Sequence, residues 1–85
     1  MESPMLHGAD DYYNMGVVMY FYKCYHEAVE YFSMAIKLEP NDSDIYFSRG
    51  VTNLNLNQKH EALMDLLKAI ELGENVPQKL IDECD

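Results

Sequence analysis

The sequence predicts an all-α fold made of two similar helical hairpins followed by a short C-terminal helix. Three observations support this prediction: a repeat of 34 residues, apolar residues spaced by three and four positions, and proline or glycine where helices would end. A chain of 85 residues forms one domain at most. Because 48% of the residues are hydrophobic, composition favours a folded chain over a disordered one.

The repeat is found when residues 9–42 are aligned with residues 43–76. Many more positions are identical than a chance alignment would give, which is typical of stacked structural units. The identical pairs are Asp10 with Asp44, Tyr12 with Tyr46, Gly16 with Gly50, Val17 with Val51, His26 with His60, Glu27 with Glu61, Ala28 with Ala62, Ala35 with Ala69, Ile36 with Ile70, Leu38 with Leu72, and Asn41 with Asn75.

Each repeat is predicted to hold two helices. In the first repeat, one helix should begin at Asp10 or Asp11, which are good N-cap residues, and should end near Tyr22. The other should cover residues 26–38, and Pro40 should end it because proline cannot continue a helix. Apolar residues recur at the helical period in both stretches.

The second repeat is predicted to place helices at residues 44–56 and 60–72, after a capping turn at residues 41–43. Gly73 should end the last of these helices in a left-handed conformation. Pro77 suits the first turn of a fifth, short helix. The predicted organisation is a flexible segment at residues 1–8, repeats at residues 9–42 and 43–76, and a capping helix at residues 77–85.

These positions resemble the tetratricopeptide repeat, in which an aromatic residue, a glycine four residues later, and then Ala, a bulky apolar residue, Ala and Pro recur at set offsets. The matching residues are Tyr12, Gly16, Ala28, Phe32, Ala35 and Pro40, then Tyr46, Gly50, Ala62, Leu66 and Ala69. Some positions depart from the pattern. Arg49 and Asn53 stand where apolar residues are common, which we expect to weaken their helix, and the turn positions hold Lys23 and Asn57 where glycine is frequent.

The resemblance implies a right-handed superhelical fragment that binds another protein and is not an enzyme. In the family, the first helices of successive repeats line a concave groove. Carried over by position, the groove residues are Asp10, Tyr13, Asn14, Val17, Tyr20, Asp44, Phe47, Ser48, Val51, Leu54 and Asn55. Their spacing supports this set, because Tyr13, Val17 and Tyr20 lie four and three residues apart on one helix face.

The expected ligand is an apolar or amphipathic segment of another protein, and basic residues on it would suit the acidic ends of the groove. One alternative is that these groove residues only pack on one another. A subclass of the family binds acidic chaperone tails through Lys and Asn residues. Here Tyr13, Val17 and Ser48 stand at three of those positions, which disfavours such tails. A co-chaperone-like adaptor therefore remains an alternative only.

Self-association is a second alternative, because the first helix has no preceding repeat to cover Met15, Val18 and Tyr22. Either Met5 and Leu6 fold back over this surface or another copy covers it, which would give a homodimer.

Composition and spacing exclude several other classes of function. The formal net charge is −9 and the Lys and Arg residues are scattered. Nucleic-acid binding needs a dense basic patch, so it is not expected. The sequence has no apolar run of about 20 residues, which predicts no membrane span. Cys24 and Cys84 are expected to be free thiols, which suits a cytoplasmic protein.

No catalytic activity, metal or cofactor is expected. Cys24 and His26 form one isolated pair, whereas a tetrahedral metal site needs four ligands. No nucleophile with a neighbouring base is recognisable, and no glycine-rich phosphate loop is present. Carboxylates are predicted mostly on outer helix faces and at turns.

Overall fold

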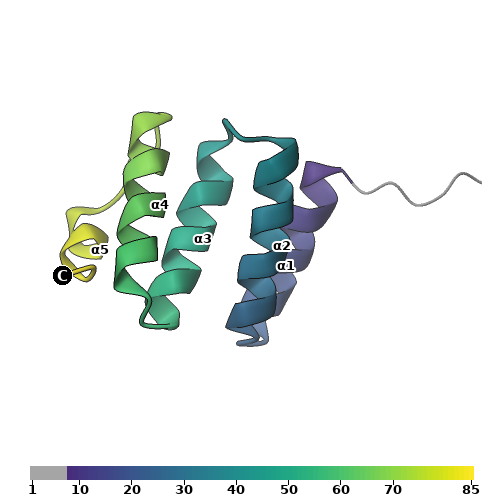
Figure 1. Ribbon diagram of the computed structural model, residues 1–85, viewed down its shortest axis with the longest axis horizontal. Coiled ribbons are helices and arrows are strands. Elements are labelled where there is room, and N and C mark those ends of the chain that lie inside the picture. The colour runs from purple at the N-terminus through teal and green to yellow at the C-terminus, as the bar shows by residue number, and fades with distance from the viewer. Residues whose placement is uncertain (1–7) are drawn as a thin grey trace, which may run out of the picture.

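The computed structural model describes residues 8–85, in which helices are the only regular secondary structure (Figure 1). The helices are α1 (Ala9–Phe21), α2 (Tyr25–Leu38), α3 (Ser43–Asn55), α4 (Lys59–Glu71) and α5 (Gln78–Asp82). Most of the segment expected to be flexible, including Met5 and Leu6, lies outside the described residues. The prediction of an all-α fold is confirmed.

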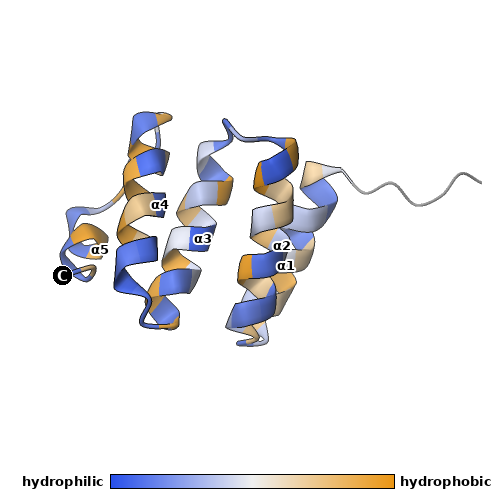
Figure 2. Cartoon of the chain, viewed as in Figure 1, coloured by the Kyte–Doolittle hydropathy of each residue, from blue (hydrophilic) through white to orange (hydrophobic). Residues whose placement is uncertain are grey.

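The helices form two antiparallel hairpins that stand side by side, α1 with α2 and α3 with α4 (Figure 1). Helix α2 packs against α3 and joins the two hairpins, and α5 lies beside α4 at the far end of the row. Apolar and hydrophilic residues alternate along every helix in Figure 2, as expected where each helix has one face in the core and one in solvent.

Three helices end in the same way, with one residue in the left-handed conformation. Lys23 follows α1 with φ 63°, Asn57 follows α3 with φ 60°, and Gly73 follows α4 with φ 107°. After α1, the Cys24 N–H donates to the Met19 carbonyl at 2.8 Å, which satisfies a carbonyl group that the helix itself leaves free. The predicted left-handed end at Gly73 is confirmed.

The N-cap of α1 was predicted at Asp10 or Asp11, which is two or three residues too late, because Gly8 is the N-cap. The carboxylate of Asp11 accepts a hydrogen bond from the Gly8 N–H at 3.3 Å, so this residue stabilises the first turn from within the helix. The capping turn before α3 was predicted correctly. Asp42 caps this helix by accepting from the Asp44 N–H at 3.0 Å.

Glycine allows the two helices of each hairpin to pack closely. A Cβ atom on Gly16 would lie 2.6 Å from the ring of Phe32, and one on Gly50 would lie 2.9 Å from Leu66. Phe32 and Leu66 are almost fully buried and fill the centre of their hairpins. These contacts explain why glycine occupies the middle of two helices despite its cost of about 1 kcal/mol relative to alanine.

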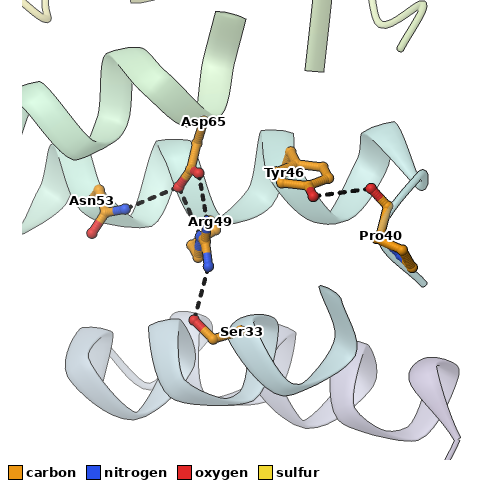
Figure 3. A network of polar contacts seen from close by, with 6 residues as sticks. All are labelled: Ser33, Pro40, Tyr46, Arg49, Asn53 and Asp65. Carbon is orange, nitrogen blue, oxygen red and sulfur yellow. Dashed lines mark hydrogen bonds and ion pairs between the residues drawn. The ribbon is translucent and has the colours of Figure 1, made fainter. Parts of the chain in front are cut away.

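A polar network joins α2, α3 and α4 (Figure 3). Asp65 is only 5% exposed and accepts hydrogen bonds from Arg49 and Asn53. Asp65 is thus an exception to the expectation that carboxylates lie mostly on outer helix faces and at turns. Arg49 and Asn53, which we expected to weaken α3, have this carboxylate as a partner.

Candidate functional site

An apolar hollow of about 240 Å³ lies between α1 and α3. Its lining comes mainly from these two helices, and Phe32 of α2 contributes from between them. The lining residues are Tyr13, Val17, Tyr20, Phe21, Phe32, Phe47, Ser48, Val51 and Thr52. None of these side chains carries a charge at neutral pH, so the hollow suits an apolar group.

The structure brings six of the predicted groove residues together at this hollow: Tyr13, Val17, Tyr20, Phe47, Ser48 and Val51. Their positions follow from helical spacing. Residues four and three apart on α1 lie on one face, and the same spacing on α3 supplies the opposite wall.

Two hydrogen bonds connect α1 to α3 beside the hollow. The Tyr13 hydroxyl lies 3.3 Å from the Ser48 hydroxyl, and the Asn55 amide donates to the Tyr20 hydroxyl at 3.3 Å. Tyr13 also packs against Phe32, with ring centroids 5.7 Å apart. These contacts restrain both tyrosine rings, so the walls are formed before any ligand binds.

The remaining predicted residues lie elsewhere. Asn14 lines a separate hollow on the other side of α1, and Leu54 packs against the cluster of Ala62, Leu66 and Cys84. Asp10 and Asp44 are exposed in the first turns of α1 and α3 and do not line the hollow. Asn55 lies at its edge through the hydrogen bond to Tyr20.

Sequence reasoning missed three lining residues. Phe21 is 76% exposed and lies four residues after Val17, so the spacing on α1 could have identified it. Thr52 likewise lies four residues after Ser48. Phe32 was matched only to the bulky apolar position of the repeat, and it both belongs to the core and lines the hollow.

The two ionisable groups of the described residues that have a shifted pKa, Cys84 and Arg49, do not line this hollow. Burial raises the pKa of the Cys84 thiol, and the nearby carboxylates of Asp85 and Glu83 raise it further. The hydrogen bond to Asp65 raises the pKa of Arg49, so its guanidinium stays charged. In residues 8–85, no three His, Cys, Asp or Glu side chains group in a way that would hold a metal ion, and no helix there has the length and apolarity to span a bilayer.

Comparison with known proteins places the repeat in a family. Sequence models of the tetratricopeptide repeat match residues 9–42 and residues 31–64. The chain is 38% identical to the Protein STIP1 homolog of Dictyostelium discoideum over 64 residues, which are 75% of this chain and 11% of that protein. It is 31% identical to the DnaJ homolog subfamily C member 7 of Mus musculus over 67 residues, or 79% of this chain and 14% of that protein.

A third similarity, of 35% identity over 63 residues, is to the UDP-N-acetylglucosamine–peptide N-acetylglucosaminyltransferase of Giardia intestinalis. That match covers 74% of this chain and 4% of the transferase. The chain therefore spans a small part of each relative. The paired helices, the packing glycines and the two sequence matches agree: this chain belongs to the tetratricopeptide repeat family, whose repeats serve as protein–protein interaction modules.

Proposed function

We propose that this chain is a non-enzymatic docking module that binds an amphipathic segment of another protein in the hollow between α1 and α3. The observation that carries this proposal is an apolar hollow whose walls are already held in place and whose rim has an aromatic ring, Phe21, that is 76% exposed. Large exposed aromatic side chains beside a preformed pocket are typical of binding hot spots.

The volume and lining of the hollow suit one or two bulky apolar side chains from the ligand. The tyrosine and serine hydroxyl groups and the side-chain oxygen of Asn55 at its edge offer hydrogen bonds to a peptide backbone. An amphipathic helix or an extended segment would meet both requirements.

Charge favours a ligand with basic residues beside its apolar ones. The formal net charge of the chain is −9, and Asp10 and Asp44 are exposed on the two helices that form the hollow. The lining contains no Lys or Arg, and the nearby Arg49 is paired with Asp65. An acidic tail would therefore find no cation here, which makes the co-chaperone-like alternative the weaker one.

Synthetic peptides provide the test. A peptide of about four helical turns with a Leu and Phe stripe and Lys elsewhere is compared with one that has the same stripe and Glu elsewhere. We expect the Lys peptide to bind more tightly, with only a modest loss in salt, because the floor is apolar. Tyr13→Ala should weaken binding, and Glu30→Ala on the outer face of α2 should not.

Circular dichroism must show that both variants stay folded. Equal binding of the Lys peptide by Tyr13→Ala and by the unchanged chain would contradict the proposed site.

A further inference from the structure

Helix α1 has a second apolar side, opposite the proposed binding hollow. Met15, Val18 and Met19 line a separate hollow of about 220 Å³ together with Asn14 and with Tyr31 of α2. Tyr22, four residues after Val18, extends the same side. We call these six residues the α1 end face. Val18 is 48% exposed and Tyr22 is 75% exposed, so in the described part of the chain this face is open.

In the second hairpin, the face that corresponds to the α1 end face is covered by the first hairpin. The residues 34 positions after those of the α1 end face include members of the polar network: Arg49 corresponds to Met15, Asn53 to Met19 and Asp65 to Tyr31. There α2 lies over α3, and its Ser33 accepts a hydrogen bond from Arg49 at 3.0 Å.

Burial at the corresponding positions differs sharply. Thr52 on α3 is fully buried, whereas Val18, its counterpart on α1, is 48% exposed although its side chain is more apolar.

The polarity of these two faces is thus the reverse of what their exposure to solvent would favour. The covered face of the second hairpin has Arg49 and Asn53 of α3 beside Asp65 of α4. The open face of the first hairpin has two Met, Val, Asn and Tyr22 from α1 and its end, beside Tyr31 of α2. End faces of repeat proteins are normally polar, because an apolar end costs solubility. An apolar open end therefore indicates a surface that is covered when the protein is assembled.

We propose that the α1 end face binds the same face of a second copy and forms a two-fold symmetric homodimer. Charge favours this occupant. No charged residue occurs from Tyr12 to Tyr22, although the chain as a whole carries −9, so the strip from Met15 to Tyr22 brings no charge of its own into the interface, and the charges of Asp11 and Lys23 flank it. A strip along one helix, centred near Val18, is also able to pair with its own copy about a two-fold axis.

The other end of the molecule disfavours head-to-tail stacking. In the first hairpin, Ile45 of α3 packs on Ala28 and Phe32. At the C-terminal end, Leu80 and Ile81 of α5 pack against the cluster of Ala62, Leu66 and Cys84, in which Ala62 and Leu66 correspond to Ala28 and Phe32. Helix α5 thus occupies the place that a following hairpin would take, and an assembly built on the α1 end face stops at two copies.

Analytical ultracentrifugation of the full chain from about 1 μM to 1 mM tests the proposal. This concentration range covers the dissociation constants of weak dimers. We expect a concentration-dependent shift from monomer to dimer. Val18→Glu should raise the dimer dissociation constant by about tenfold or more, because the charge would be buried at the interface. Leu67→Glu is the matched control, since Leu67 is also 48% exposed but lies on α4. It should leave the constant unchanged.

Disulfide cross-linking tests the symmetry even where a charged variant folds poorly. In a Cys24→Ser background, Val18→Cys should give a covalent dimer under mild oxidation, and Leu67→Cys should not. A chain that stays monomeric at 1 mM overturns the proposal, as does a dimer that Leu67→Glu disrupts and Val18→Glu does not. Dimerisation only after removal of residues 1–7 also overturns it, because those residues would then be the cover. None of these outcomes depends on the proposed ligand of the α1–α3 hollow.

Discussion

The guanidinium group of Arg49 binds both carboxylate oxygens of Asp65, with Nε donating to Oδ2 at 2.9 Å and Nη2 donating to Oδ1 at 2.7 Å. Asn53 adds a third bond to the same carboxylate at 3.1 Å, and the remaining Arg49 nitrogen reaches Ser33 on α2 at 3.0 Å (Figure 3). One side chain thereby joins the two hairpins, and its fork geometry fixes how they are oriented.

Removal of the carboxylate should therefore destabilise the whole chain. Asp65→Ala leaves Arg49 without its acceptor in a site where the Arg49 side chain is only 25% exposed. We expect a loss of about 2–4 kcal/mol in the free energy of unfolding. This is somewhat less than the loss for a fully buried ion pair, because the site is partly exposed. Thermal and urea unfolding measure it. Glu61→Ala on the exposed face of the same helix serves as the control and should change stability by less than about 0.5 kcal/mol.

The first hairpin suggests an apolar replacement for this network. The triple variant Arg49→Met, Asn53→Met and Asp65→Tyr copies Met15, Met19 and Tyr31 into the second hairpin. It should lose less stability than Asp65→Ala alone, because no buried charge is left unpaired. A larger loss in the triple variant would show that the polar network stabilises the fold more than apolar side chains in the same positions do.

The two packing glycines should respond differently to alanine. A methyl group on Gly16 would meet the rigid ring of Phe32 at 2.6 Å, whereas one on Gly50 would meet the Leu66 side chain at 2.9 Å and the Asp65 Cβ atom at 3.2 Å, which are less severe contacts. We expect Gly16→Ala to cost about 1–3 kcal/mol by overpacking and Gly50→Ala to cost clearly less. Paired thermal melts give the comparison, and equal losses would mean that the ring of Phe32 moves as easily as Leu66.

The two cysteines, Cys24 and Cys84, should differ in reactivity. Burial raises the pKa of Cys84, and its side chain is 8% exposed, so the reactive thiolate is scarce at neutral pH. Neutral iodoacetamide should alkylate the more exposed Cys24 first in the folded chain, and both thiols should react similarly in denaturant. Preferential labelling of Cys84 in the folded chain would contradict the packing of α5.

The same shift has a consequence for stability. A raised thiol pKa means that the folded state favours the protonated form, so this contribution is complete below the ordinary thiol pKa and is lost as pH rises above it. Stability should therefore fall at alkaline pH, and Cys84→Ala should reduce that fall.

Sequence alone predicted the features that depend on local chemistry. Helical spacing and the breakers Pro40 and Gly73 were enough to place four helices within two residues of their observed ends. The role of Asp65 was not predictable in this way, because its partner Arg49 is 16 residues away on another helix. Asn14 and Leu54 were assigned to the groove from family positions, and their actual places depend on which side of each helix the neighbouring hairpin covers.

Two adjacent aromatic residues belong to different surfaces, one to the proposed binding site and the other to the proposed dimer interface. Phe21 is 76% exposed and lines the α1–α3 hollow, whereas Tyr22 is 75% exposed and belongs to the α1 end face. Because both rings are mostly in solvent, neither alanine substitution should change the melting temperature much.

We expect Phe21→Ala to weaken binding of the Lys peptide by about tenfold, the loss typical of a hot-spot aromatic side chain, and to leave the sedimentation of the chain unchanged. Tyr22→Ala should weaken dimerisation and leave peptide binding unchanged. Peptide titration by fluorescence anisotropy and ultracentrifugation of the same two variants provide both readouts. If both substitutions impair both activities equally, the two sides of α1 do not act as separate surfaces, and one shared interface must replace the two proposed.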